Sequence, residues 1–205
     1  RGPVSRNGKE SCTGSIGVRL GSGNGKATFK IAGFGGQGVV LTSIVLGRAA
    51  ILDGKYVAQS ASYGSESRGG ECNAEVVISL NQIDYPLVDK VQTLVVMSQP
   101  ALSRYLPDLF SGGILLVDPD MIRKMPERDD ITVLRIPATA TADALGRRIV
   151  ANMVMLGALQ ATTRVVSEKS LATAIRENAR PETVELNLKA AREGINIARM
   201  SNSRA

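Results

Sequence analysis

Hydrophobic and polar residues follow one another along the chain in blocks that predict strands and helices in turn. Apolar runs of strand length lie at 27–34, 56–59, 72–80, 93–97, 114–117 and 131–136. Segments that read as helices lie at 39–52, 102–110, 143–159, 167–178 and 181–198. Apolar strands flanked by helices are typical of a mostly parallel sheet that is covered on both faces. We therefore predict a single α/β domain whose C-terminal third is helical.

The first 26 residues do not follow this pattern. Glycine, serine and asparagine fill them, and only Ile16, Val18 and Leu20 alternate as a strand would. So few apolar groups do not offset the entropy that is lost on ordering, which favours a flexible tail over a short edge strand. We expect a flexible basic tail over 1–26 and one domain over 27–205.

Charge supports this division of the chain. The first 30 residues hold six lysines or arginines and one acid, so they carry +5 of the formal net charge of +6. The basic character therefore belongs to the tail and predicts no nucleic-acid-binding face, although Arg147 and Arg148 could form a local patch. Aromatic residues, at 3%, are too few for a base-stacking platform.

Composition excludes several kinds of chemistry within this chain. Histidine is absent, which excludes a Ser-His-Asp triad, a Cys-His pair and a histidine-ligated metal. Two cysteines, Cys12 and Cys72, are too few for an all-cysteine iron–sulfur cluster or zinc site. No stretch is typical of a secretory signal or a membrane span, so we expect a cytoplasmic protein without membrane contact. We expect no catalytic residue and no metal ligand in this chain.

The first candidate site is a glycine loop between a predicted strand and a predicted helix. Its residues are Gly33, Gly35, Gly36, Gln37 and Gly38, in the spacing G-x-G-x-x-G. Such glycines let the backbone approach a phosphate, and free N–H groups at the helix start bind its charge. The acid that would bind a ribose about 20 residues further on is missing. A dinucleotide, another anionic group, or a tight turn that binds nothing all remain open.

The second candidate site is the polar glycine loop at 60–70. Its candidate binding residues are Tyr63, Gly64, Glu66, Arg68, Gly69 and Gly70. Arg68 can bind a carboxylate or phosphate through two parallel hydrogen bonds, and the glycines after it permit a positive φ. A surface turn held by a Glu66–Arg68 ion pair is the alternative.

Both loops, with three further segments, resemble a known family. The similar segments read GFGGQGVV at 33–40, SYGSESRGG at 62–70, EVVIS at 75–79, ANMVMLG at 151–157 and ELNLKA at 185–190. Over about residues 27–198 the chain resembles the gamma subunit of 2-oxoacid:ferredoxin oxidoreductases. The second loop is more similar to the 2-oxoglutarate branch than to the indolepyruvate branch.

The resemblance implies one subunit of a multi-subunit oxidoreductase. Such a complex would convert a 2-oxoacid, here 2-oxoglutarate, and coenzyme A into succinyl-CoA, carbon dioxide and reduced ferredoxin. Thiamine diphosphate, magnesium and iron–sulfur clusters (4Fe-4S) would lie in alpha and beta partners, with a delta subunit as a further candidate partner. This chain would help to bind coenzyme A through the two glycine loops and close the active site. A purely structural assembly subunit and a free-standing dinucleotide-binding oxidoreductase are the alternatives.

Other residues carry narrower expectations. Lys55 could add a cation to the coenzyme A site. Asn152 reads as an amide at a helix start or in the core rather than as a ligand contact. Met153, Met155, Leu156 and Leu159 read as core.

Overall fold

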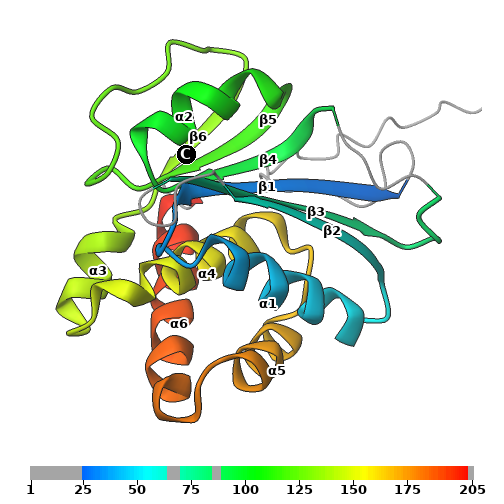
Figure 1. Ribbon diagram of the computed structural model, residues 1–205, viewed down its shortest axis with the longest axis vertical. Helices are drawn as coiled ribbons and strands as arrows, with labels where there is room; N and C mark the ends of the chain where they lie inside the picture. The colour runs from blue at the N-terminus through cyan, green and yellow to red at the C-terminus, as the bar shows by residue number, and fades with distance from the viewer. Residues whose placement is uncertain (1–24, 64–69, 85–88, 203–205) are drawn as a thin grey trace, which may run out of the picture.

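The computed structural model describes residues 25–63, 70–84 and 89–202, which form one sheet and the helices around it (Figure 1). The strands are β1 (Lys26–Phe34), β2 (Tyr56–Tyr63), β3 (Glu71–Ser79), β4 (Val91–Val96), β5 (Leu109–Val117) and β6 (Thr132–Arg135). Their order in the sheet is β2-β3-β1-β4-β5-β6. β3 is antiparallel to both of its neighbours, β2 and β1. The other three pairs, β1–β4, β4–β5 and β5–β6, are parallel. The predicted α/β domain with a mostly parallel sheet is confirmed.

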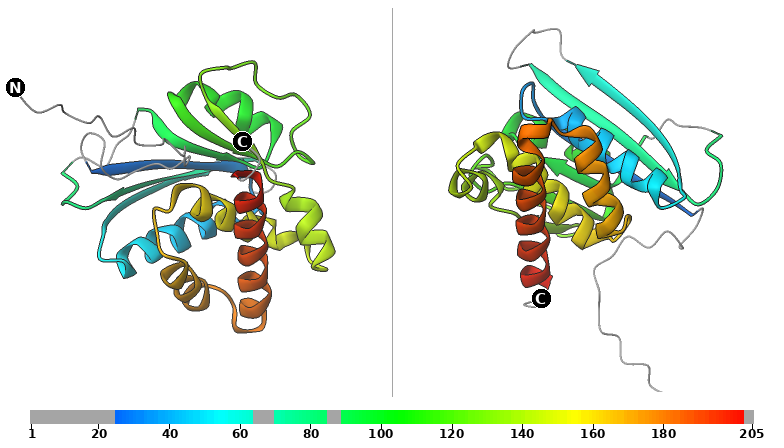
Figure 2. Two further views of the ribbon diagram at one scale, coloured as in Figure 1. Left: turned by 180° about the vertical axis from the view of Figure 1, so that it is seen from behind. Right: turned by 90° about the horizontal axis from the view of Figure 1, so that it is seen from below.

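Helices cover the two faces of this sheet unequally. The larger layer holds α1 (Val39–Leu52), α4 (Ala151–Thr163), α5 (Glu168–Asn178) and α6 (Val184–Asn202). Its apolar side chains form one core with the facing strands. α2 (Gln99–Tyr105) packs on the opposite face in a second, smaller core, and α3 (Ala138–Ala144) lies beside one end of the sheet (Figures 1 and 2). The helical C-terminal third was correctly predicted, and the methionines of α4 are core residues.

Two predicted helices were wrong in their extent. The segment 102–110 divides, because α2 ends at Tyr105, a 3₁₀ turn containing Pro107 follows, and β5 begins at Leu109. Proline lacks the N–H that would continue a helix. The segment 143–159 also divides, because Gly146 takes a φ of +87° between α3 and α4.

The structure also bears on the predicted loop, the predicted tail and the predicted absence of a membrane span. β2 continues to Tyr63, past the predicted start of the loop. β1 begins at Lys26, and residues 1–24 of the predicted tail lie outside the described residues. Within the described residues, no helix is long and apolar enough to cross a membrane.

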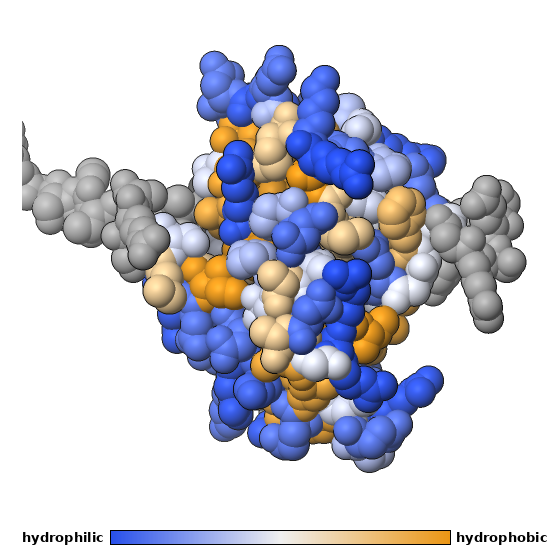
Figure 3. All heavy atoms as spheres, turned by 90° about the vertical axis from the view of Figure 1, so that its left-hand side faces the viewer, coloured by the Kyte–Doolittle hydropathy of each residue, from blue (hydrophilic) through white to orange (hydrophobic). Residues whose placement is uncertain are grey.

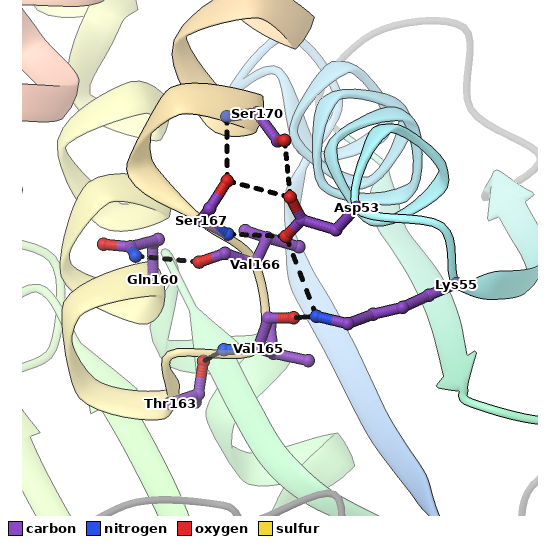
Figure 4. A network of polar contacts seen from close by, with 8 residues as sticks. All are labelled: Asp53, Lys55, Gln160, Thr163, Val165, Val166, Ser167 and Ser170. Carbon is purple, nitrogen blue, oxygen red and sulfur yellow. Dashed lines mark hydrogen bonds and ion pairs between the residues drawn. The ribbon is translucent and has the colours of Figure 1, made fainter.

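The start of α5 is held by a carboxylate from the end of α1 (Figure 4). Asp53 accepts hydrogen bonds from the Ser167 N–H at 2.6 Å, from the Ser167 hydroxyl at 2.8 Å and from the Ser170 hydroxyl at 2.5 Å. Lys55 lies 3.7 Å from the same carboxylate and donates to the carbonyl of Val165. The Lys55 ammonium therefore binds the segment before α5, so the expectation that it adds a cation to the coenzyme A site was wrong.

Asp53→Asn should lower the free energy of unfolding by about 1–3 kcal/mol near pH 7, because it removes charged hydrogen bonds. Burial alone would raise the pKa of Asp53, but the bonds from Ser170 and Ser167 and the charge of Lys55 lower it below its usual value. A lowered pKa stabilises the fold above the unfolded pKa of about 3.9, and this contribution is lost as the pH falls through the folded pKa. The difference in the free energy of unfolding between wild type and variant, measured by denaturation from pH 7 to pH 3, should therefore shrink as the pH falls.

Asp143→Asn is the matched control for this experiment. Asp143 pairs with Arg148 at 2.9 Å, and both side chains are largely exposed. The loss should stay below about 1 kcal/mol, as for other exposed ion pairs. An Asp53→Asn variant no less stable than Asp143→Asn would contradict the capping role.

Candidate functional site

The glycine loop lies where the winding of the sheet reverses. From β1 the chain crosses to α1 on one face, and from the adjacent β4 it crosses to α2 on the other. A crevice at the carboxyl ends of two such strands is the usual ligand site of an open α/β sheet. A cavity of about 290 Å³ lies here, between the loop at Gly36 and Gln37, the ends of β4 and β5 at Met97 and Asp118, and residues 139–151. We call it the crevice cavity.

The loop is fixed in place by Gln37. Its side-chain oxygen accepts from the Phe34 N–H at 2.6 Å, and its amide nitrogen donates to the Met97 carbonyl at 2.8 Å. A β-carbon on the buried Gly33 would overlap the Gln37 oxygen, so Gly33 makes room for this brace. Both ends of the Gln37 amide are thus used to tie the loop to the end of β4.

The last glycine of the loop contacts the start of α4. Gly38 is the N-cap of α1 with a φ of +76°, and a β-carbon there would overlap the amide nitrogen of Asn152. The Asn152 side chain is buried, donates to the Gly38 carbonyl at 3.4 Å and accepts from the Met153 N–H at 2.9 Å. Asn152 is therefore a buried amide at a helix start, as expected.

The structure joins the two predicted loops at one end of the sheet. The Gly35 N–H donates to the Gly70 carbonyl at 2.9 Å, and the backbone of Tyr63 pairs with Cys72 beside them. Gly35 and Gly36 are exposed, and Gly36 has a φ of +97°. Four of the predicted residues, Gly64, Glu66, Arg68 and Gly69, lie outside the described residues.

The ionisable groups near the crevice cavity are engaged in structure. Asp118 is buried and accepts from the Thr139 N–H at 2.8 Å and from the Thr139 hydroxyl at 2.6 Å. Burial raises the pKa of the Cys72 thiol above its usual value. Among the described residues, no group of histidine, cysteine or acidic side chains could hold a metal ion. This arrangement suits the binding of a ligand.

A second cavity, of about 480 Å³, lies on the other side of Gly38 and Asn152. Arg147 and Arg180 line it, and Ile149 lines both cavities. We call it the basic cavity. Arg180 was missed by the sequence analysis, because nothing in its local sequence marks it. Figure 3 looks onto this end of the molecule, where apolar patches lie among charged side chains.

Comparison with known proteins gives the family. The family model described as pyruvate ferredoxin/flavodoxin oxidoreductase matches residues 28–197. The chain belongs to this family. The 2-oxoglutarate synthase subunit KorC of Methanothermobacter marburgensis is 51% identical over 172 residues, 80% of this chain and 92% of that protein. KorC of Methanocaldococcus jannaschii is 45% identical over 174 residues, 83% of this chain and 92% of that protein.

Solved structures agree with this membership. The gamma subunit of keto/oxoacid ferredoxin oxidoreductase from Geobacter sulfurreducens is 37% identical, with a TM-score of 0.75 over 85% of this chain and 99% of that one. The 2-oxoglutarate:ferredoxin oxidoreductase of Magnetococcus marinus shares the fold, with a TM-score of 0.78 at 21% identity, over 85% of this chain and 31% of that one. The predicted resemblance to a gamma subunit is confirmed. The chain is accordingly a subunit of a 2-oxoacid:ferredoxin oxidoreductase.

Proposed function

We propose that this chain is the gamma subunit of a 2-oxoglutarate:ferredoxin oxidoreductase and that its glycine loop and crevice cavity receive part of coenzyme A. The chain assembles with alpha and beta subunits and covers their active site. The choice of 2-oxoglutarate is supported by the KorC relatives, at 51% and 45% identity. The Magnetococcus enzyme, which shares this fold, was solved with 2-oxoglutarate, coenzyme A and succinyl-CoA bound.

The observation that carries the proposal is the exposed loop at the crevice cavity. Gly36 lines this cavity, it and Gly35 are exposed and have no side chain, and α1 begins three residues after Gly36. The first N–H groups of a helix have no partner within the helix and favour negative charge. A phosphorylated ligand with a long neutral arm, such as coenzyme A, matches a polar loop beside a cavity that also contains Met97, Met121 and Ile149.

The second loop completes the proposed site. Gly70 is hydrogen-bonded to Gly35, so residues 63–70 end beside the first loop. Arg68 would supply a cation, Glu66 would orient it, and Gly64 and Gly69 would allow close backbone approach. Tyr63 would contact the ligand arm or a partner subunit.

The partner subunits would hold thiamine diphosphate, magnesium and iron–sulfur clusters (4Fe-4S), which supply decarboxylation and electron transfer to ferredoxin. The contribution of this chain would be to bind coenzyme A, orient it and exclude water when it covers the site. Ile149, which is 56% exposed at the rim of both cavities, is suited to contact a partner.

Gly36→Asp tests the loop in the assembled complex. Of the described residues, none beyond the chain neighbours lies within 4 Å of the added β-carbon, and Asp and Asn both tolerate a positive φ. The new charge should raise the Michaelis constant for coenzyme A about tenfold, equivalent to about 1.4 kcal/mol. The constant for 2-oxoglutarate should change much less.

Gly36→Asn is the matched control, because it has nearly the same shape and no charge. It should raise the coenzyme A constant less than about threefold, or about 0.7 kcal/mol. Equal coenzyme A constants in the two variants and the wild type would refute the binding role. Loss of subunit association by both variants would instead identify the loop as an assembly element.

A further inference from the structure

The basic cavity has the composition of an anion site. Its polar lining consists of Arg147, Arg180 and Thr183 with the amides of Asn152, Asn178 and Asn187. Among the described residues that line it, none is acidic. Glu182 and Glu185 are close in sequence to this lining, but both are exposed and neither lines the cavity.

Among the described residues, the two arginines differ from their neighbours in having no acidic partner. Arg148 pairs with Asp143, and Arg48 pairs with Glu177. Within the described part of the chain, neither Arg147 nor Arg180 forms an ion pair through its guanidinium. Two arginines at one acid-free cavity repel each other, and a bound anion would remove that repulsion.

Helix ends add to this positive potential. Gly38 and Leu41 belong to the start of α1, Val150 and Asn152 to the start of α4, and Leu186 to the first turn of α6, and all five line the cavity. The N-caps of α1 and α4 are Gly38 and Val150, neither of which can cap its helix with a side chain. The first N–H groups of these helices carry partial positive charge. Figure 1 shows α1 and α4 both starting at the end of the sheet beside α3.

One helix end has the opposite polarity. α5 ends at the cavity with Asn178 and Ala179. The Asn178 amide donates to the Ala174 carbonyl at 2.8 Å, which satisfies one acceptor of that helix end. The positive charge of three helix starts and two arginines therefore exceeds the negative charge of one partly capped helix end.

We infer that the basic cavity binds the phosphate groups of coenzyme A, an inference that rests on the proposed function. Ile149 lines both cavities, so one extended molecule that passes over it would reach both of them. Its charged phosphates would lie beside Arg147 and Arg180, and its neutral arm would run to the crevice cavity. These two arginines would then set the affinity for coenzyme A without taking part in the chemistry.

The test uses Arg147→Gln, Arg180→Gln and the double variant in the assembled complex. Each side chain is exposed, and the change removes charge while leaving a polar, uncharged side chain. Each single variant should raise the Michaelis constant for coenzyme A about tenfold, and the double variant more, because each loses a charge-assisted contact. The turnover number at saturating coenzyme A and the constant for 2-oxoglutarate should be unchanged. Arg192→Gln, which removes an exposed α6 arginine away from both cavities, should leave all constants unchanged.

Pantetheine, used in place of coenzyme A as the acyl acceptor, isolates the role of the phosphates. It has the same thiol arm and no phosphate, so the arginine variants should turn it over like the wild type. An unchanged constant for coenzyme A, or an equal loss with both acceptors, would overturn the inference. So would complexes that no longer assemble, since the cavity would then be a subunit interface. If these variants behave like wild type while Gly36→Asp impairs coenzyme A binding, the inference fails and the proposed function stands.

Discussion

Gly194→Ala is expected to destabilise the protein by about 3 kcal/mol or more, although alanine is the better helix former. Gly194 of α6 and Gly157 of α4 lie at the closest approach of the two helices. A β-carbon on Gly194 would overlap the carbonyl of Val154, and one on Gly157 would overlap the carbonyl of Ala191. Both obstructions are backbone atoms, so relief requires the helices to move apart.

Gly47→Ala provides the matched control, because Gly47 is also a buried helical glycine. A β-carbon there would lie 3.3 Å from the Val57 side chain and 3.6 Å from the Gln59 side chain, both of which can adjust. The expected result is a change between no effect and a gain of about 1 kcal/mol from helix propensity. Denaturant unfolding followed by circular dichroism measures both variants. Equal midpoints for Gly194→Ala and wild type would show that the helices can separate without cost.

This helix crossing also positions the proposed ligand site. Asn152 in the first turn of α4 and Asn187 in that of α6 line the basic cavity, and the glycine pair fixes the distance between their helices. A partly separated α4–α6 pair should therefore weaken coenzyme A binding before the sheet unfolds. Gly157→Ala, assayed in the complex at a temperature where it stays folded, is suited to reveal this coupling.

The fold was predictable wherever local pattern and tertiary environment agree. Buried strands such as β4 contain short apolar runs, and α5 has Ser167 as an N-cap whose side chain accepts from the Ser170 N–H. The pattern failed at 106–113, between the end of α2 and the predicted strand at 114–117. The predicted helix ran to residue 110, yet β5 begins at Leu109 and includes Gly112 and Gly113. The pairing of that strand with β4 and β6 is non-local and leaves no mark in its own sequence.

In the candidate site, too, the local features could be predicted and the contacts between distant residues could not. The glycine loop was predictable because its spacing is local, and so was its position between a strand and a helix. The contact of Gly38 with Asn152 joins residues far apart in the sequence. Arg180 reaches the basic cavity only because the turn between α5 and α6 packs near the start of α1. Lys55 was misplaced because its partner, Asp53, is itself bound to the distant Ser167.

Lys30 shows why charge along the sequence needs the fold for its interpretation. It was counted with the basic tail, but it lies within β1, and its side chain is 8% exposed. Its ammonium is 2.5 Å from Asp108, 2.9 Å from Glu75 and 4.9 Å from the centre of the Tyr105 ring. This cation therefore holds β1, β3 and the turn after α2 together.

Lys30→Met should cost about 2–4 kcal/mol, because it leaves two carboxylates without their cation. The value falls below that of a fully buried pair, since the Glu75 and Asp108 side chains are 20% and 31% exposed. Burial alone would lower the pKa of Lys30, but its bonds to Asp108 and Glu75 raise it above the usual value. This contribution is complete below the unfolded pKa of about 10.4 and is lost as the pH rises through the folded pKa. The difference in the free energy of unfolding between wild type and variant should therefore be constant from pH 6 to pH 9 and shrink above about pH 10.5.

Arg104→Met is the control, because Arg104 also pairs with a β3 acid, Glu71, and lies over the same Tyr105 ring, but its side chain is 63% exposed. It should cost much less than Lys30→Met, because solvent screens exposed pairs. Glu75→Gln combined with Lys30→Met should recover part of the loss, since it removes one of the two uncompensated charges. Unfolding at pH 7 by urea compares the four proteins. Equal losses for Lys30→Met and Arg104→Met, or no recovery on adding Glu75→Gln, would mean that the buried cation contributes no more than a surface pair.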